Sequence, residues 1–134
     1  MDSQPLERLR LARSDDVTRV RQAARRWAVD LGFGLVDQTK IVTAVSELAR
    51  NTILYGGGGH VEAEVMRNDQ RTGLRITFHD DGPGIADVEL ALRDGYGTGQ
   101  GLGLGLGGAR RLMNEFAIKS APGRGTTVVV TQWR

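Results

Sequence analysis

The chain has 134 residues, which suits one domain with a buried core, and its 19 glycines are gathered into a few short segments. It has no cysteine, which excludes disulfides and thiolate metal sites, and it shows neither a signal-peptide pattern nor an apolar run of membrane-spanning length. The net charge is +2 and aromatic residues make up 5%, so the arginines between residues 8 and 26 are interpreted as a solvated helix face rather than a nucleic-acid surface.

The first part of the chain predicts a short strand and two helices. Leu9 and Leu11 alternate with charged residues, as in a strand. Ser14 is the predicted N-cap of a helix that Gly32 closes, and a second helix is predicted from Val36 to Tyr55. The positions expected to face the core are Val17, Val20, Ala24, Trp27, Ala28 and Leu31 in the first helix and Ile41, Val45, Leu48 and Thr52 in the second.

The second part begins with four consecutive glycines, Gly56 to Gly59, which end the second helix. The predicted elements then follow in order: strands over 60–67 and 71–80, a short helix over 87–93, a mobile glycine-rich segment over 95–108, a helix over 109–115, and strands over 116–120 and 126–133. This order predicts an α/β two-layer sandwich, a single domain over residues 1–134 with a mostly antiparallel sheet and helices packed on one face.

Glu47 and Asn51 form the first candidate site. They are four residues apart on the second predicted helix, so they share a face. A carboxylate and an amide supply hard oxygen ligands that suit Mg²⁺, directly or through water, and the carboxylate can also accept a proton. The alternative is an ordinary solvated helix face.

Asp80 is the second candidate. It continues the inward face of a strand whose alternating residues are apolar, namely Leu74, Ile76 and Phe78. A carboxylate that points into a core needs a donor, and the exocyclic amine of adenine is a suitable one. Gly82 and Gly84 would let a flat base approach the backbone. The alternative is a local Asp-Gly turn in which the carboxylate bonds to its own backbone.

The glycine-rich segment from Gly97 to Gly108 is the third candidate. Glycines expose backbone N–H groups, and a predicted helix follows, so the segment is a plausible phosphate cradle. Residues 103–108 match G-x-G-x-x-G, but no strand directly precedes them and no βαβ unit follows. The alternative is a flexible glycine loop.

In this order, the three candidates resemble the nucleotide site of the GHKL superfamily, which includes DNA gyrase, Hsp90, histidine kinases and MutL and has the Bergerat fold. Glu47–Asn51 resembles its E-x-x-x-N box and Asp80–Gly84 its D-x-G-x-G box. Gly101–Gly107 resembles the glycine-rich lid box, and Gly123–Thr127 resembles the closing box.

Within that superfamily, the chain most resembles the RsbT-type serine/threonine kinases of bacterial stress signalling. The resemblance rests on Asn51 followed by Tyr55 and the four glycines, on Asp81–Ile85, and on Gly-Leu-Gly-Leu-Gly before Arg110–Met113. The related anti-sigma-factor kinases usually carry Ala-His-type residues after the asparagine. This chain has residues 52–56 there, which argues against direct binding of a sigma factor.

The resemblance implies ATP and Mg²⁺ as cofactors. Asp80 would accept from the adenine amine with support from Thr126, and Gly84 would lie against the base. Asn51 would coordinate Mg²⁺. Glu47, linked to the metal through water, would be the general base or would orient the attacking hydroxyl. The implied nucleotide-binding residues are Asn51, Asp80, Gly82, Gly84, Ile85, Gly101, Leu102, Gly103, Leu104, Gly105 and Thr126.

The resemblance also implies stressosome-type partner switching in the bacterial cytoplasm. The expected partners are an RsbS-like STAS-domain substrate, an RsbR-like scaffold and an RsbU-like PP2C phosphatase that the released kinase activates, with no nucleic acid and no membrane. His60 and His79 are expected to be structural or exposed rather than catalytic. The alternatives are an anti-sigma-factor kinase, a nucleotide-gated binding module with little phosphotransfer, and an ATPase machine, which is expected to need transducer domains beyond these residues.

Overall fold

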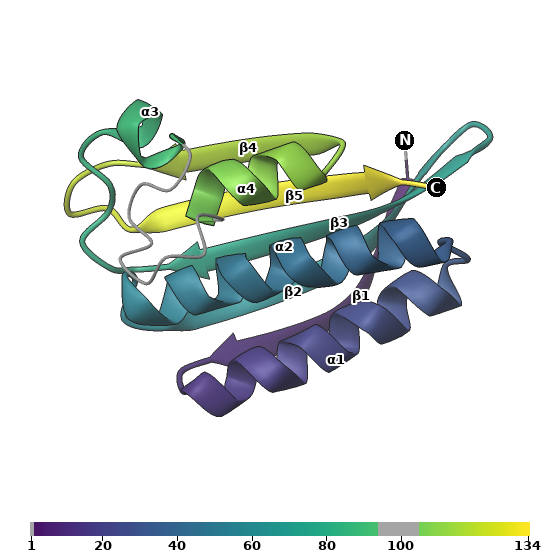
Figure 1. Ribbon diagram of the computed structural model, residues 1–134, viewed down its shortest axis with the longest axis horizontal. Coiled ribbons are helices and arrows are strands. Elements are labelled where there is room, and N and C mark those ends of the chain that lie inside the picture. The colour runs from purple at the N-terminus through teal and green to yellow at the C-terminus, as the bar shows by residue number, and fades with distance from the viewer. Residues whose placement is uncertain (1, 94–104) are drawn as a thin grey trace.

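The computed structural model describes residues 2–93 and 105–134, which form a five-stranded sheet with helices on one face (Figure 1). The strands are β1 (Asp2–Leu11), β2 (Gly59–Asn68), β3 (Arg71–Asp80), β4 (Glu115–Ser120) and β5 (Thr126–Trp133), and the helices are α1 (Ser14–Asp30), α2 (Leu35–Leu54), α3 (Val88–Ala91) and α4 (Gly105–Leu112). The sheet order is β1-β2-β3-β5-β4, and every neighbouring pair is antiparallel. The predicted two-layer sandwich is therefore confirmed.

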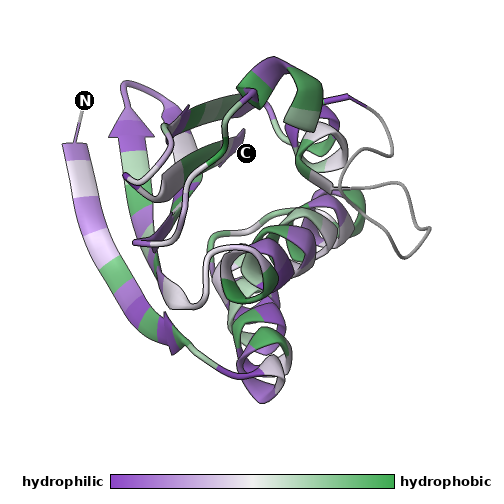
Figure 2. Cartoon of the chain, turned by 90° about the vertical axis from the view of Figure 1, so that its left-hand side faces the viewer, coloured by the Kyte–Doolittle hydropathy of each residue, from purple (hydrophilic) through white to green (hydrophobic). Residues whose placement is uncertain are grey.

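The core lies between the sheet and the two long helices, which Figure 2 shows nearly end on beside the strands. Strand β3 alternates as predicted, because Leu74, Ile76 and Phe78 are all buried on the helix side. The residues of α2 that were expected to face the core are buried as well: Ile41, Val45, Leu48 and Thr52. None of the described helices is long and apolar enough to cross a membrane.

Strand β1 runs over 10 residues, much further than the short stretch predicted around Leu9 and Leu11. It lies at the edge of the sheet, and its register against β2 shifts between Pro5 and Glu7. An edge tolerates proline because no neighbour needs the missing N–H. Glu7 then ties β1 to α1, since its Oε1 accepts from the indole Nε1 of Trp27 at 2.9 Å.

The start of α1 differs from the prediction, because Ser14 is the first helical residue and Arg13 occupies the N-cap position. The capping group is Asp16, whose Oδ2 accepts from the backbone N–H of Ala12 at 2.9 Å and of Arg13 at 3.0 Å. These two bonds stabilise the charged carboxylate and hold the pKa of Asp16 below its usual range. At the other end of the helix, Gly32 has a φ of 84° and closes it as predicted.

Helix α4 begins at Gly105 and not at Ala109, so the end of the predicted mobile segment is helical. A tertiary contact explains why glycines are present in this helix. A Cβ on Gly107 would lie 2.2 Å from the carbonyl oxygen of Leu92, so only glycine lets α4 pack against the residue that follows α3. Glu115, predicted as the end of this helix, is the first residue of β4.

Candidate functional site

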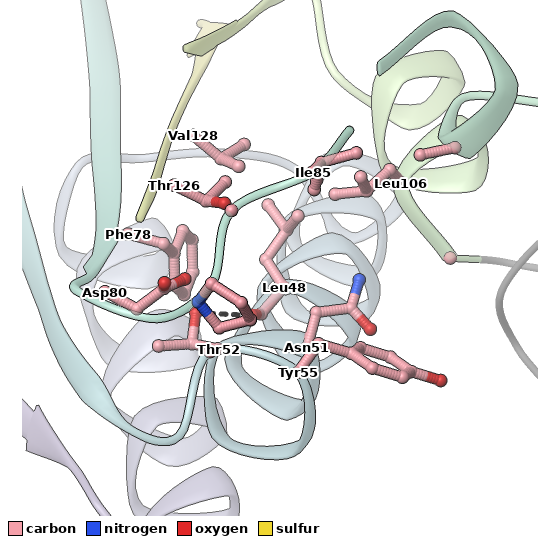
Figure 3. A pocket seen from close by; sticks show the side chains of 15 residues that line it. Leu48, Asn51, Thr52, Tyr55, Phe78, Asp80, Ile85, Leu106, Thr126 and Val128 are labelled. Carbon is pink, nitrogen blue, oxygen red and sulfur yellow. Dashed lines mark hydrogen bonds between the residues drawn. The ribbon is translucent and has the colours of Figure 1, made fainter. Parts of the chain in front are cut away.

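A pocket of about 660 Å³ opens between the C-terminal end of α2, the end of β3 and the start of α4 (Figure 3). It is lined by Leu48, Asn51, Thr52, Tyr55, Gly56, Phe78, Asp80, Pro83, Gly84, Ile85, Ala91, Gly105, Leu106, Thr126 and Val128. A cavity of this size with mostly apolar walls and a few polar groups is typical of a small-molecule site.

Asp80 supplies a buried carboxylate to this pocket, and its residue is only 6% exposed. Its Oδ1 accepts from the backbone N–H of Gly82 at 2.9 Å, which is the local turn bond considered as the alternative to ligand binding. The structure thus contains the local turn bond, which occupies one oxygen and leaves the other for the predicted ligand contact. Within residues 2–93 and 105–134, Oδ2 has no hydrogen-bond partner, so it is available to a donor on a ligand.

Glycines on two neighbouring segments make room for Asp80. A Cβ on Gly56, which follows α2, would lie 2.3 Å from the carboxyl carbon of Asp80. A Cβ on Gly125 would lie 2.2 Å from the main-chain oxygen of Asp80, and Gly125 also has a φ of 72°. The position of the carboxylate is thus fixed by backbone that packs directly against it.

The structure explains the glycines at positions 82 and 84 differently from the prediction that they let a flat base approach the backbone. A Cβ on Gly82 would lie 2.6 Å from the main-chain oxygen of Gly56, and one on Gly84 would lie 1.9 Å from that of Ala121. Both glycines are therefore required by packing within the protein, whatever ligand is bound. Gly84 lines the pocket. Gly82 is not among the lining residues, and its backbone N–H donates to Oδ1 of Asp80.

Thr126 lies opposite Asp80 in the pairing of β3 with β5, and it also lines the pocket. Its Oγ1 lies 2.8 Å from Oγ of Ser120, which in turn accepts from the backbone N–H of Ile85 at 2.8 Å. Sequence reasoning missed Ser120. The alternation of β4 contained the signal, because Ser120 shares the inward face of Phe116 and Ile118.

The structure separates the two residues of the first candidate site. Asn51, a predicted nucleotide-binding residue, lines the pocket, but Glu47 is not among the lining residues. The Glu47 side chain is 13% exposed, and its Oε1 lies 2.7 Å from Nη1 of Arg50. Sequence reasoning missed this partner, although the i,i+3 spacing on a helix indicates it.

The glycine-rich candidate is described only in part. Gly105 and the next residue, Leu106, line the pocket from the first turn of α4. The other predicted nucleotide-binding residues of this segment lie outside the described residues: Gly101, Leu102, Gly103 and Leu104. The N-terminal end of α4 therefore borders the pocket, where exposed backbone N–H groups favour an anion.

His60 and His79 face away from the pocket. They are paired across β2 and β3, with ring centroids 5.3 Å apart, and their neighbour Asp80 points to the opposite side of the sheet. Nδ1 of His79 lies 2.8 Å from Oγ1 of Thr127, and burial lowers the pKa of His60. Their placement agrees with the structural role expected for them.

Comparison with known proteins identifies the family of this chain. The family of histidine kinase-, DNA gyrase B-, and HSP90-like ATPases matches residues 36–133. The serine/threonine-protein kinase RsbT of Bacillus subtilis (strain 168) is 44% identical over 118 residues, which cover 88% of this chain and 89% of that kinase. An anti-sigma F factor of Bacillus licheniformis is 32% identical over 129 residues, which cover 91% of this chain and 86% of that factor.

A solved structure supports the fold independently. The crystal structure of the RsbU and RsbW domains of Rv1364c from Mycobacterium tuberculosis matches with a TM-score of 0.66 at 24% identity. The match covers 96% of this chain and 31% of that one, so it concerns the fold alone. The chain therefore belongs to the histidine kinase-, DNA gyrase B-, and HSP90-like ATPase family, and within it to the RsbT-type serine/threonine-protein kinases.

Proposed function

We propose that this kinase transfers the γ-phosphoryl group of Mg-ATP to a serine or threonine of a small STAS-domain protein. The observation that carries the proposal is the buried carboxylate of Asp80, which presents one oxygen to a pocket of about 660 Å³ that Asn51 also lines. The identity of 44% to a serine/threonine kinase over 88% of the chain supports the chemistry.

Adenine would occupy the part of the pocket nearest the sheet. Its exocyclic amine would donate to Oδ2 of Asp80, which has no hydrogen-bond partner among the described residues. Phe78, Ile85 and Val128 supply apolar surface around this point, and such walls suit the faces of a flat base. Binding would therefore combine one directional bond with removal of apolar surface from water.

The phosphates would lie towards Asn51 and the first turn of α4. The described residues contain no group of three or more His, Cys, Asp or Glu side chains that could hold a metal ion. This fits Mg²⁺, which usually keeps several waters and takes one or two protein ligands besides substrate phosphates. The amide oxygen of Asn51 would be that ligand, Glu47 would be linked to the ion through water, and the ion would neutralise charge on the phosphates.

Transfer itself requires few protein groups, because positioning and charge neutralisation dominate phosphoryl transfer. The hydroxyl oxygen of the acceptor would bond to the γ-phosphorus while the bond to the β,γ-bridging oxygen breaks and ADP leaves. Glu47 would accept the hydroxyl proton or orient the hydroxyl, and Arg50 would hold the Glu47 carboxylate in place.

The proposed partners follow the RsbT relative. They are an RsbS-like STAS substrate, an RsbR-like STAS scaffold, and an RsbU-like PP2C phosphatase that the released kinase activates, in a stressosome-type pathway of the bacterial cytoplasm. The solved neighbour contains RsbU and RsbW domains together, which supports a link between these two domain types in that protein.

A phosphorylation assay tests the proposal. Purified protein with Mg²⁺ and γ-labelled ATP is incubated with the cognate STAS protein, and Glu47→Ala is compared with Asp30→Ala, which removes an exposed carboxylate from the last residue of α1. Glu47→Ala is expected to lose transfer and keep ATP binding, whereas Asp30→Ala keeps both. ATP binding without any labelling of the STAS protein by the wild type would leave a nucleotide-gated binding module as the function.

The anti-sigma F relative, at 32% identity, supports a second candidate, an anti-sigma-factor kinase. It is distinguished by complex formation. A stable nucleotide-dependent complex with a sigma factor in gel filtration would favour it over the RsbT-type pathway.

A further inference from the structure

Ser120 is hydrogen-bonded to three groups at the edge of the pocket. Its Oγ accepts from the N–H of Ile85 at 2.8 Å, donates to the carbonyl oxygen of Gly125 at 3.0 Å, and lies 2.8 Å from Oγ1 of Thr126. A hydroxyl has one proton and two lone pairs, so these contacts can be assigned one by one.

The Ile85 N–H is a donor and takes one lone pair of Ser120. The Gly125 carbonyl is only an acceptor, so it takes the single Ser120 proton. The remaining contact must then be a bond that Thr126 donates to the second lone pair of Ser120. Because the hydroxyl proton of Thr126 is donated to Ser120, the Oγ1 of Thr126 presents only lone pairs to the pocket.

We propose that Ser120 is a positioning residue that fixes Thr126 as a hydrogen-bond acceptor and thereby sets the preference of the pocket for a 6-amino purine. This inference rests on the proposed binding of adenine at Asp80. Asp80 and Thr126 are paired across β3 and β5, so the pocket presents two acceptors side by side. The amine at position 6 of adenine donates to such a pair, whereas the 6-oxo group of inosine places a third acceptor against it.

Removal of the Ser120 hydroxyl releases the Thr126 proton. Thr126 can then donate to a 6-oxo group, so binding of inosine triphosphate improves relative to ATP. A purely structural role of Ser120 predicts something else. Loss of its bond to Ile85 would loosen the pocket wall and weaken both nucleotides equally, with an unchanged ratio.

The experiment measures dissociation constants of Mg-ATP and Mg-ITP by calorimetry, without any acceptor protein. In Ser120→Ala, the ratio of the ITP constant to the ATP constant is expected to fall about three- to tenfold, the usual range for one neutral hydrogen bond. Ser120→Cys is the second variant, for the case that Ser120→Ala does not fold. It keeps the size of the side chain and offers only a weak hydrogen-bonding thiol, so it is expected to shift the ratio in the same direction.

Two further variants separate the explanations. Thr127→Val removes a hydroxyl from the same strand on the opposite face of the sheet, where it contacts His79, and is expected to leave the ratio unchanged. In a Thr126→Val background, Ser120→Ala is expected to have no further effect on the ratio. ATP binding with an unchanged ratio in both Ser120 variants would overturn this inference alone, and absence of ATP binding by the wild type would overturn the proposed function with it.

Discussion

Oε1 of Glu47 lies 2.7 Å from Nη1 of Arg50, within the turn of α2 that precedes Asn51. The side chain of Glu47 is the more buried of the two, at 13% exposed against 40% for Arg50. A carboxylate held in this way has a defined direction, and the proposed transfer requires such a direction because Glu47 would have to meet the acceptor hydroxyl.

The first prediction concerns Arg50. Arg50→Met removes the charged partner, so the Glu47 carboxylate loses its fixed direction. We expect kcat for transfer to the STAS protein to fall about tenfold or more, because a small misplacement of a reacting group costs that much, while the affinity for ATP stays near that of the wild type. Arg50→Lys keeps a charged donor, so its kcat for transfer is expected to lie between those of the wild type and Arg50→Met.

Arg8→Met is the matched control, since Arg8 also faces a glutamate, Glu62 at 3.5 Å, but on β1 and β2. It is expected to leave kcat unchanged. Equal loss of kcat and ATP affinity in Arg50→Met would contradict a role that acts through Glu47, because it would indicate general damage to the pocket.

The second prediction concerns Gly56. In Gly56→Ala the new Cβ would lie 2.3 Å from the carboxyl carbon of Asp80, so the carboxylate must move. We expect ATP affinity to fall at least about tenfold and stability to fall by about 1–3 kcal/mol, as for other overpacked sites. Gly34→Ala is the control because a Cβ there meets nothing within 4 Å. Calorimetry and urea unfolding give both numbers, and an unchanged ATP affinity would show that the pocket does not depend on this contact.

The third prediction concerns Asp80. Asp80→Asn can keep the bond from the Gly82 N–H to Oδ1, but it places an NH₂ donor where Oδ2 stood. A donor then faces the adenine amine, so we expect ATP binding to weaken about tenfold to a hundredfold while the fold is retained. Titration with Mg-ATP and a thermal melt separate the two effects. ATP binding at wild-type strength would exclude Asp80 as the adenine anchor.

The fourth prediction concerns pH. The backbone N–H groups of Ala12 and Arg13 lower the pKa of Asp16 in the folded chain. A lowered folded pKa means stability that is fully present above the unfolded value, about 3.9, and that is lost as pH falls through the folded value. Asp16→Ala is therefore expected to destabilise by about 1 kcal/mol at pH 7, as for a lost helix cap, and by progressively less in acid.

Urea unfolding of wild type and Asp16→Ala between pH 2 and 7 measures this difference. Asp15→Ala, which removes an exposed carboxylate from the same turn, is the control. A destabilisation by Asp16→Ala that stays constant down to the lowest pH would show that the charge of the carboxylate is not what caps α1.

The parts of the fold with a strong repeating pattern were predictable. The alternation of Leu74, Ile76 and Phe78 predicted that Asp80 points inward, and the structure confirms this. The length of β1 was not predictable, because an edge strand with little burial has no clear alternation. The start of α4 was missed because the close approach of Gly107 to Leu92 is a tertiary contact that overrides the low helix propensity of glycine.

The candidate site was predictable in its residue types but not in its connections. The motifs led to Asn51, Asp80 and Thr126, which the structure brings into one pocket. The alternation of β4 placed Ser120 on the inward face, and the i,i+3 spacing made Arg50 a candidate partner of Glu47. Which bonds then form depends on how the end of β4 meets the segment at Ile85 and on the side-chain rotamer of Glu47, and residue order does not decide either.

The register shift near Pro5 has a consequence for self-association. A 10-residue strand at the edge of a sheet is a template on which another chain can add a strand. In β1, proline removes one donor, the shift interrupts the ladder, and the charged residues Glu7, Arg8 and Arg10 follow it. These features make β1 a poor template for amyloid-like stacking. The strand still holds α1 through the bond between Glu7 and Trp27.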